Sequence, residues 1–343
     1  MTTTQKTSAY AKPLLFTGNS NPTLARKVAE SLNLPLGNCI VSRFRDGEVR
    51  VEYQESIQGR DLVLFQSTCA PQDTNLMELL LMADGALRSS AKSITAIVPY
   101  LGYARQDKCR RSIKEPIAAK LIAKLLKISG IERFVTINLH SDQVQGFFEM
   151  PVDNLYGHDS FIAELRTKQQ ETKANNNMII VSPDVGGIIR ARLFAEDAGG
   201  LHLAFIHKKR STPNKAKVLD VIGEVKDKNC ILIDDMVDTG GTLIAGAEAL
   251  KNLGANKVSA YCVHPVLSGD ATSHIENSLL DELVITDTIP YLQAETKMHT
   301  KIKQHSIAPL IAKKIREIFA PIEWTPPTLH AANLSRRENA IAI

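Results

Sequence analysis

The stretch ILIDDMVDTGGT, residues 231–242, joins a β-branched apolar run to a polar turn that contains two adjacent glycines. The run is typical of a buried strand in a parallel sheet. After the turn, Leu243, Ala247, Leu250 and Leu253 fall on one face of a helix. A strand, a loop and a helix in this order predict one βα unit of an α/β fold. Because ligands collect at the carboxyl ends of the strands in such sheets, this loop is the first candidate for a binding site.

Other parts of the chain repeat this arrangement. Its short apolar runs are LVLFQS, ITAIVPY, RFVTINL, MIIVSP, NCILIDD and KVSAYCV, with helical patterns between them. Such alternation predicts mainly parallel sheets flanked by helices. The segments that begin at Asp61 and at Asn229 both read as strand, polar loop, helix, strand and a turn that contains proline. We interpret them as two copies of one α/β domain, although any two βαβ units share part of this pattern.

The length of the chain favours two domains, because 343 residues exceed the usual size of a single core. We expect an N-terminal domain over residues 1–153 and a C-terminal domain over residues 154–320, with the boundary inside EMPVDNLYGHDS. Residues 321–343 contain a Pro-Pro pair and no apolar period. This composition indicates an extension that adds little to either core.

The composition indicates a globular protein of the cytoplasm. Apolar residues make up 44% of the chain and charged residues 23%, and the formal net charge of +4 is too small to indicate a nucleic-acid partner. The five cysteines are scattered without a CxxC pair, which favours reduced thiols over disulfides or a zinc site. The first residues show no signal-peptide core, and no apolar run reaches membrane-spanning length. We therefore expect a cytoplasmic protein without a membrane segment.

The turn after the ILI run is suited to holding an anion. Glycines let the backbone approach a ligand closely, and the N–H groups at a helix start bind phosphate. The residues of this anion seat are Thr239, Gly240, Gly241 and Thr242. No lysine follows the glycines, as it would in a loop for a nucleoside triphosphate.

Three carboxylates precede the anion seat: Asp234, Asp235 and Asp238. Carboxylates at a strand end are suited to accepting hydrogen bonds from sugar hydroxyls. The loop as a whole therefore predicts a sugar phosphate as its ligand. The alternative is an acidic turn that only caps a helix.

Two stretches of the N-terminal half carry further signals. RFRDGEVRVEY, residues 43–53, has an Asp-Gly turn between alternating residues and predicts a β-hairpin, and from spacing alone a plain surface turn is favoured over a binding site. YLGYARQDKCRRSIKEP, residues 100–116, is rich in basic residues. Its place after a predicted strand favours an anion site over a solvated loop.

Three more stretches place polar side chains near strand ends. TINLHSDQVQGFF puts His140 at a strand tip, where a histidine is more often structural than a ligand. VSPDVGGIIRAR places Asp184 at a strand end and two glycines at the start of a helix. HKKRSTPNKAKV, residues 207–218, is basic and polar, and its plain interpretation is a mobile charged loop.

Together these motifs resemble a known family. ILIDDMVDTGGT resembles the phosphoribosyl-diphosphate-binding loop of type I phosphoribosyltransferases. Combined with the FRDGE, RQD and KKR stretches, it makes the chain similar to the ribose-phosphate diphosphokinases over roughly residues 13–320. The resemblance implies two similar type I phosphoribosyltransferase-like domains, each a mainly parallel sheet flanked by helices.

The resemblance implies that the N-terminal motifs bind ATP. The residues concerned are Phe44, Asp46, Glu48, Arg105, Gln106 and Asp107. In the family the FxDGE hairpin stacks on adenine, bonds to its edge and reaches across to the site of a neighbouring subunit. The RQD motif binds ATP, with its aspartate in a supporting role.

The resemblance also implies a magnesium site and a catalytic loop. His140 contacts Mg²⁺ bound to ATP, and Asp184 lies near the ribose and a Mg²⁺ ion, whose preferred ligands are oxygens. Asn138 stands where the family usually has aspartate. Because residues 138 and 140 would share a strand face, this predicts a metal site with one negative charge fewer. Lys208 and Arg210 occupy the catalytic positions of a loop that closes over the reaction.

The implied reaction transfers the diphosphoryl group of Mg²⁺-ATP to the 1-hydroxyl of D-ribose 5-phosphate. The products are AMP and 5-phosphoribosyl 1-diphosphate, for nucleotide biosynthesis. Asp234 and Asp235 hold the ribose hydroxyls, and residues 238–242 hold the 5-phosphate.

The family further implies a homo-oligomer, expected to be a hexamer, with phosphate and ADP as effectors. Two alternatives remain. A phosphoribosyltransferase would use the same loop without requiring FRDGE or RQD. A catalytically silent homologue is disfavoured by the retained metal-binding and catalytic residues.

Overall fold

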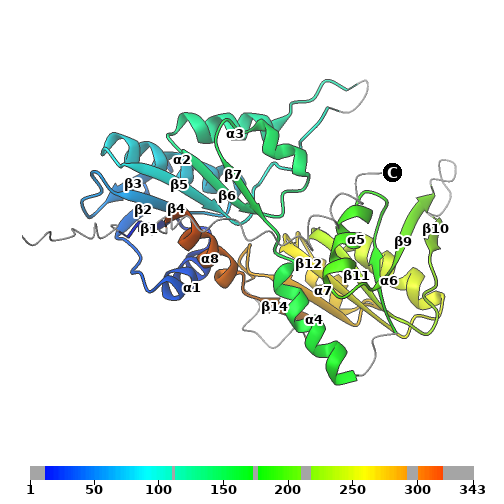
Figure 1. The fold of residues 1–343 in the computed structure, drawn as a ribbon. Helices are drawn as coiled ribbons and strands as arrows, with labels where there is room; N and C mark the ends of the chain where they lie inside the picture. The colour runs from blue at the N-terminus through cyan, green and yellow to red at the C-terminus, as the bar shows by residue number, and fades with distance from the viewer. Residues whose placement is uncertain (1–11, 110–112, 173–176, 210–217, 292–299, 320–343) are drawn as a thin grey trace, which may run out of the picture.

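The computed structural model describes residues 12–109, 113–172, 177–209, 218–291 and 300–319. These residues form two α/β lobes that lie side by side (Figure 1). The first lobe is built around strands β1–β7 and the second around β8–β14. Each contains a mainly parallel sheet flanked by helices, which confirms the predicted fold class.

The sheet of the first lobe has five parallel strands in the order β1-β4-β5-β6-β7. Its strands are β1 (Leu14–Thr17), β4 (Asp61–Phe65), β5 (Ser93–Val98), β6 (Arg133–Ile137) and β7 (Val152–Leu155). Strands β2 (Cys39–Arg43) and β3 (Val49–Tyr53) pair antiparallel in a separate two-stranded sheet, which confirms the predicted hairpin. Tyr53 anchors this hairpin, because its hydroxyl donates to the Met82 carbonyl at 2.8 Å and its ring packs edge-on against Phe16.

The sheet of the second lobe has the strand order β10-β9-β8-β11-β12-β13-β14. Its strands are β8 (Met178–Ser182), β9 (His202–Lys209), β10 (Val218–Ile222), β11 (Asn229–Val237), β12 (Lys257–Pro265), β13 (Glu282–Thr286) and β14 (Ile302–His305). They run parallel except for β10, which pairs antiparallel with β9. The prediction that residues 207–218 form a loop is therefore wrong at both ends of the segment. Residues 207–209 complete β9 and residue 218 begins β10, because their backbones pair across the hairpin.

Helices cover both faces of each sheet. They are α1 (Pro22–Leu32), α2 (Gln72–Arg88), α3 (Ala118–Ile128), α4 (Asp159–Thr172), α5 (Ile188–Asp197), α6 (Gly241–Asn252), α7 (Ala271–Glu276) and α8 (Ala308–Phe319), with one 3₁₀ turn, η1 (Asp142–Phe147). Helix α6 is the helix predicted after the ILIDDMVDTGGT stretch. The outer face of the first sheet packs against α2 and α3, and that of the second against α6 and α7.

A single hydrophobic core connects the inner faces of the two sheets. It contains Val63 and Ile137 of the first sheet together with Ile180 and Val284 of the second, all at most 1% exposed. Helices α1, α4, α5 and α8 also contribute buried side chains to this core. The two lobes therefore share apolar packing over part of their length.

Helix α8 follows the second sheet in sequence but packs on α1 of the first lobe (Figure 1). The Arg316 guanidinium of α8 donates to the backbone carbonyl of Ser31 at the end of α1. The division into residues 1–153 and 154–320 stays a prediction, and its boundary falls inside β7. The described segments thus pass between the lobes twice, once after β7 and once before α8. The predicted extension over residues 321–343 lies outside the described residues.

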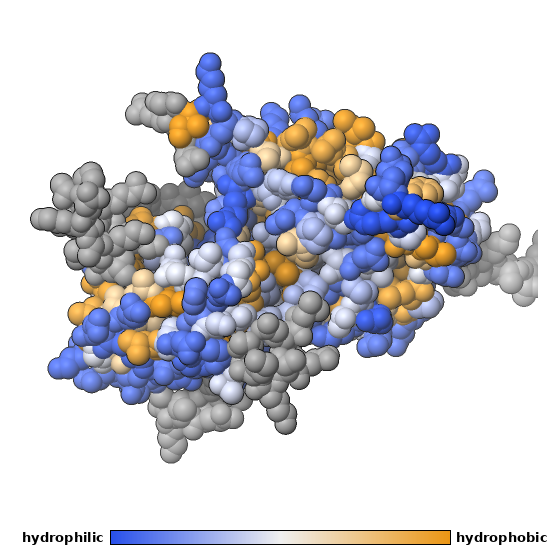
Figure 2. All heavy atoms as spheres, turned by 180° about the vertical axis from the view of Figure 1, so that it is seen from behind, coloured by the Kyte–Doolittle hydropathy of each residue, from blue (hydrophilic) through white to orange (hydrophobic). Residues whose placement is uncertain are grey.

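The surface carries scattered apolar side chains. Figure 2 shows several separate apolar patches on the face opposite to that of Figure 1, divided by polar side chains. The most exposed large apolar residues include Ile128 at 78% and Ile189 at 73%. Within the part of the chain that the structure describes, no helix combines the length and apolar character needed to cross a bilayer.

Candidate active site

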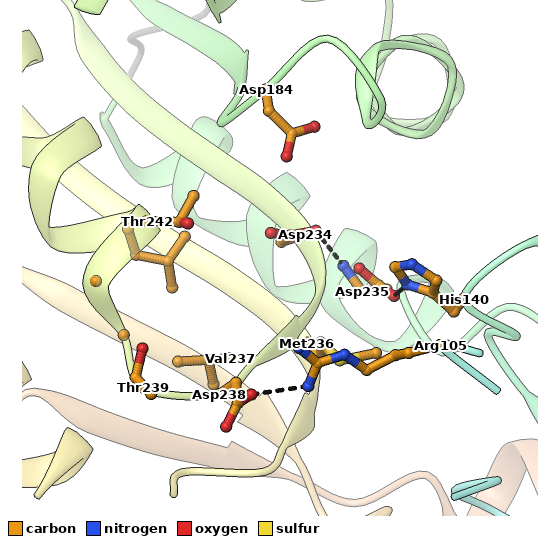
Figure 3. Close-up of a pocket in the computed structure, with 13 residues that line it drawn as sticks. Arg105, His140, Asp184, Asp234, Asp235, Met236, Val237, Asp238, Thr239 and Thr242 are labelled. Atoms are coloured by element: carbon orange, nitrogen blue, oxygen red, sulfur yellow. Dashed lines mark hydrogen bonds and ion pairs between the residues drawn. The ribbon is translucent and has the colours of Figure 1, made fainter. Parts of the chain in front are cut away.

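The carboxyl ends of strands from both sheets meet at one pocket. In the second sheet the chain proceeds from β8 to β9 on one side and from β11 to β12 on the other, so the boundary between β8 and β11 is a topological switch point. The second lobe lines the pocket with Asp184 and residues 234–243 (Figure 3). The first lobe contributes Arg105 and His140. The fold thus brings together most of the site residues that the sequence singles out.

The anion seat forms where β11 ends and α6 begins. Gly240 has a φ of 79°, a left-handed conformation that glycine adopts without strain. Helix α6 starts at Gly241, so the N–H groups of its first turn open onto the loop. Thr239 and Thr242 line the pocket beside the two glycines. This is the arrangement of backbone donors and hydroxyls that binds phosphate at a helix N-terminus.

The connection after β12 supports the backbone of this loop. The Leu267 N–H donates to the Val237 carbonyl at 2.9 Å, and the Ser268 N–H donates to the Asp238 carbonyl at 3.2 Å. Hydrogen bonds from Ser268 and Arg105 lower the pKa of the Asp238 carboxyl. The connection after β12 and Arg105 therefore both hold the loop in place.

Arg105 joins the ATP-side motif to the ribose-phosphate loop. Its Nη1 atom lies 2.7 Å from Asp238 Oδ2, although the two residues are 133 positions apart (Figure 3). Arg105 is half-exposed, so the ion pair is open to solvent and exchanges readily with other ligands. One cation of the first lobe thus already reaches the loop of the second.

The two adjacent carboxylates form a connected network. Arg190 Nη1 lies 2.9 Å from Asp234 Oδ1 and 3.1 Å from Asp235 Oδ1. The other oxygen of Asp235, Oδ2, accepts a hydrogen bond from His140 Nδ1 at 2.7 Å. Asp235 is almost fully buried, with 5% of its side chain exposed, whereas Asp234 and Arg190 are about one-fifth exposed. The network runs from the second lobe into the first.

The network gives the two aspartates different pKa values. Burial and the neighbouring Asp235 raise the pKa of Asp234 to about 8. Burial also opposes the ionisation of Asp235, but the His140 hydrogen bond and the Arg190 charge outweigh it and lower the pKa of Asp235. Asp235 in turn raises the pKa of His140. Asp235 is therefore the carboxylate that keeps its charge, whereas Asp234 takes up a proton readily.

Asn138 does not face the predicted metal site. Strand β6 ends at Ile137, and Asn138 has a left-handed φ of 42°, a conformation that asparagine tolerates better than most residues. Its Oδ1 atom accepts the Gly157 N–H at 2.5 Å. The strand alternation that would place residues 138 and 140 on one face is therefore broken. The premise that residues 138 and 140 share a strand face is wrong, because the Asn138 side chain binds a backbone N–H instead, and the charge of the metal site stays a prediction.

A buried histidine supports the turn that leads to His140. His264, on β12, is 2% exposed, and its Nε2 atom lies 3.1 Å from the Asn138 carbonyl. Its Nδ1 atom lies 3.0 Å from the Thr288 hydroxyl. Burial lowers the pKa of His264 to about 4, so the ring is neutral at neutral pH. Because a carbonyl only accepts hydrogen bonds, Nε2 carries the proton.

Asp184 is fixed at the start of α5. Its Oδ1 atom accepts the Gly187 N–H at 3.0 Å, and its carbonyl accepts a hydrogen bond from the Ser182 hydroxyl at 2.6 Å. Gly187 leaves little space here, because a Cβ atom at this position would lie 2.9 Å from Ser182 Oγ. The carboxylate therefore enters the pocket on a rigid support.

The other ATP-binding candidates lie outside this pocket. Phe44, Asp46 and Glu48 occupy the turn of the β2–β3 hairpin, at the end of the first lobe farthest from the second (Figure 1). The Phe44 side chain is 52% exposed, and Asp46 Oδ1 accepts the Glu48 N–H at 3.2 Å. Gln106 and Asp107 follow Arg105 but do not line the pocket.

The catalytic candidates are only partly described. The backbone of Lys208 lies in β9, two strands from β11 in the sheet order. Arg210 lies outside the described residues. Their predicted role remains a prediction.

The corresponding loop of the first lobe is filled by the protein itself. Gln66, which follows β4 as Asp234 follows the apolar run of β11, is fully buried. Its Oε1 atom accepts the backbone N–H and the hydroxyl of Ser20, and its Nε2 atom donates to Glu78 Oε2 at 2.8 Å. Gln66 is therefore engaged by protein groups, whereas Asp234 lines the pocket of the second lobe.

Sequence reasoning missed Arg190 and His264. Arg190 stands three residues after a glycine pair at a helix start, and a basic side chain at that position next to an acidic strand end was the available signal. Nothing in the sequence near His264 indicates that it bonds to a residue 126 positions away. Both roles depend on the way the sheets are brought together.

Comparisons with known proteins identify the family of this chain. Residues 13–130 match the family described as the N-terminal domain of ribose phosphate pyrophosphokinase, and residues 209–323 match the phosphoribosyl synthetase-associated domain. The chain is 50% identical to the ribose-phosphate pyrophosphokinase of Ralstonia nicotianae, covering 89% of this chain and 94% of that protein. It is 49% identical to the enzyme of the same name from Marinomonas sp., with coverage of 90% and 96%.

A solved structure extends the likeness to three dimensions. The crystal structure of phosphoribosylpyrophosphate synthetase from Mycobacterium smegmatis superposes with a TM-score of 0.82 and 41% identity, covering 90% of this chain and 99% of that one. Two parallel-sheet lobes with an acidic loop at a helix N-terminus define a phosphoribosyltransferase-like protein. Within that class, the chain belongs to the ribose-phosphate pyrophosphokinase family, and it is a diphosphotransferase.

Proposed function

We propose that the chain transfers the diphosphoryl group of Mg²⁺-ATP to the 1-hydroxyl of D-ribose 5-phosphate and releases AMP. One observation carries this proposal. The anion seat and paired carboxylates of the second lobe share a pocket with Arg105 and His140 of the first. An acceptor sugar phosphate and a nucleotide donor would therefore meet between the lobes. Family membership supports the same reaction.

The second lobe binds ribose 5-phosphate in this proposal. The 5-phosphate lies in the seat formed by residues 238–242, where α6 supplies backbone N–H groups. Asp234 and Asp235 accept hydrogen bonds from the ribose hydroxyls and direct the 1-hydroxyl towards the donor. Holding the two reactants in line contributes much of the rate, because no covalent intermediate is required.

The donor set of the pocket fits a Mg²⁺ ion that accompanies ATP. His140 donates a hydrogen bond from Nδ1 to Asp235, which leaves Nε2 to face a metal, as is usual for ligating histidines. Asp184 adds a carboxylate, the kind of ligand that Mg²⁺ prefers. His140 would contact the Mg²⁺ ion bound to ATP and Asp184 would lie near the ribose and a Mg²⁺ ion, whose charge would offset the charge that develops on the phosphate oxygens.

The first lobe binds ATP, and a second subunit completes its site. Arg105, with Gln106 and Asp107 after it, is placed to contact phosphates. The hairpin turn with Phe44 lies away from the pocket and is exposed, which favours its use at the site of a neighbouring subunit. We propose a homohexamer in the cytoplasm, with phosphate and ADP as effectors. Lys208 and Arg210 would stabilise the transferring group.

An assay for AMP tests this function. The purified chain is incubated with ATP and ribose 5-phosphate, with and without Mg²⁺ and inorganic phosphate. We expect AMP and 5-phosphoribosyl 1-diphosphate to form in equal amounts and only when Mg²⁺ and ribose 5-phosphate are both present. AMP release without ribose 5-phosphate, or no turnover under any of these conditions, would contradict the proposal.

A further inference from the structure

Arg190 lies behind the two carboxylates of the ribose-phosphate loop and does not line the pocket itself. It belongs to the first turn of α5, and α5 packs on β8 and β11. Strands β8 and β11 are hydrogen-bonded neighbours, so a side chain from the start of α5 reaches the end of β11. Arg190 thus acts on the pocket through other residues.

A single nitrogen of Arg190 contacts both aspartates. Nη1 lies 2.9 Å from Asp234 Oδ1 and 3.1 Å from Asp235 Oδ1. This nitrogen carries two hydrogens, which suffice for one bond to each carboxylate. Consecutive residues of a strand normally point to opposite faces. The shared contact therefore holds one oxygen from each carboxylate at a common point.

The two carboxylates need such a partner. Asp234 and Asp235 are adjacent, and only 20% and 5% of their side chains are exposed. Ionisation of both carboxylates is disfavoured at this separation and burial, and Asp234 therefore takes up a proton readily. A guanidinium stays charged at all physiological pH values, so Arg190 opposes this effect and favours the ionised form of both groups.

The contact leaves the other oxygens for different tasks. Asp235 Oδ2 binds His140, so its direction also determines the orientation of that ring. Asp234 lines the pocket, and its Oδ1 atom is bonded to Arg190 and to the Asp235 N–H at 2.9 Å, so Oδ2 is the oxygen that these two bonds leave for a ligand. Rotation of either carboxylate would break a contact with Arg190. In this arrangement Arg190 determines which oxygen of Asp234 is left for the sugar.

We propose that Arg190 is the positioning residue for ribose recognition, orienting Asp234 and Asp235 so that they accept hydrogen bonds from the sugar hydroxyls. This inference rests on the proposed function, because it assigns the ribose to these carboxylates. Arg190 acts on the sugar half of the site, so its loss affects ribose 5-phosphate much more than ATP.

The chain offers a matched control on the same helix. Arg192 is also on α5, but it is exposed and pairs with Glu196 at 3.4 Å in a surface ion pair. Arg192→Met removes the same charge from the same helix without touching either aspartate. Arg190→Met removes the contact with both aspartates. Arg190→Lys keeps a cation but loses the planar guanidinium group.

Binding of ribose 5-phosphate to the full-length variants, measured by calorimetry without ATP, tests the proposal. We expect Arg190→Met to weaken binding by at least about 10-fold, as for a lost charge-assisted hydrogen bond, and Arg190→Lys to recover part of the loss. Arg192→Met should bind as the unaltered chain does. In steady-state assays, KM for ribose 5-phosphate should rise in Arg190→Met, while KM for ATP stays within about 3-fold.

The outcomes separate this inference from the proposed function. If the unaltered chain binds no ribose 5-phosphate, the assignment of the loop fails and Arg190 has no ribose to position. If the unaltered chain binds it and Arg190→Met binds equally well, only the role of Arg190 is refuted. Equal changes in both KM values would show a structural role and refute it too. Should Arg190→Met not fold, Arg190→Lys decides, because unchanged binding in that variant refutes the positioning role.

Discussion

At the scale of single residues, the site depends on polar side chains whose surroundings set their charge. His264 is the clearest case, because it is buried, neutral and bonded to the Asn138 carbonyl two residues before His140. Its neighbour Asn138 holds Gly157. A chain of contacts thus passes from the second sheet to the histidine that would face the metal.

The buried His264 predicts a loss of stability in mild acid. Burial lowers its pKa from the usual 6.5 to about 4, so between these values the unfolded chain binds a proton that the folded chain does not. Its contribution to stability is therefore complete above pH 6.5 and declines as the pH falls towards 4. From pH 7.5 to pH 5 we expect a loss of about 2 kcal/mol from this group.

Denaturant unfolding of the unaltered chain and of His264→Gln at both pH values measures this contribution. The variant should be less stable at pH 7.5 but should lose less stability on acidification. An equal loss in the two proteins would mean that His264 does not titrate in this range.

A second prediction at this scale concerns Lys208. In the proposed function it is a cation beside the transferring group, so it should act on the chemical step more than on binding. Lys208→Ala is expected to lose most of kcat while ribose 5-phosphate still binds. Single-turnover AMP formation and calorimetry separate the two effects, and near-normal turnover would remove Lys208 from the catalytic assignment.

At the scale of elements, the anion seat depends on the conformation of its glycines. Gly240 has a φ of 79°, and a Cβ atom there would lie 3.2 Å from Ile275 Cγ1. Gly240→Ala should therefore cost about 1–2 kcal/mol of stability and distort the start of α6. We expect a weaker affinity for ribose 5-phosphate, measured by calorimetry.

Gly200→Ala is the control for this change. Gly200 has a φ of 80° in the turn between α5 and β9, with no atom within 4 Å of an added Cβ. It should suffer similar backbone strain without affecting the phosphate seat. If both variants bound ribose 5-phosphate equally, the conformation of Gly240 would not matter for binding.

The elements also show what the sequence reveals and what it does not. Long apolar runs identified β4, β5, β6, β8, β11 and β12, because these strands are buried on both faces. Strand β7 (VDNL) and strand β14 (IKQH) are short and partly polar, so no period distinguishes them from loops. The charged strand β9 was mistaken at its end for a loop, since its pairing with β10 depends on backbone groups.

Some residues of the site could likewise be predicted from the sequence, and others could not. Residues that sit at a strand end or in a glycine turn, such as Asp184 and Gly240, were recognisable from local pattern. Arg190 and His264 were not, because their partners come from other elements and their roles exist only in three dimensions. Asn138 was misplaced because β6 ends one residue before it and the chain then turns left-handed.

At the scale of the whole molecule, one core joins the inner faces of the two sheets. Ile311 of α8 is fully buried in it. Ile311→Ala should lower the free energy of unfolding by about 2–5 kcal/mol, as expected for a buried isoleucine that leaves a cavity. Because α8 packs on α1, we expect faster hydrogen exchange in α1 and β1 as well as in α8.

Hydrogen exchange followed by mass spectrometry measures this effect for each segment. Ile128→Ala on the exposed face of α3 is the control, since 78% of that side chain is already in solvent. Faster exchange confined to the second lobe would show that the lobes do not depend on each other through α8.

The return of α8 to the first lobe has a consequence for the order in which the protein is made. Helix α1 buries Leu24, Ala25, Val28 and Ala29, yet the helix that packs on it is translated only at residues 308–319. The first sheet covers part of this apolar surface, and the part that α8 covers stays open during synthesis until about 275 further residues have been made. Until then, the nascent first lobe is expected to offer this part of α1 as a binding surface to chaperones.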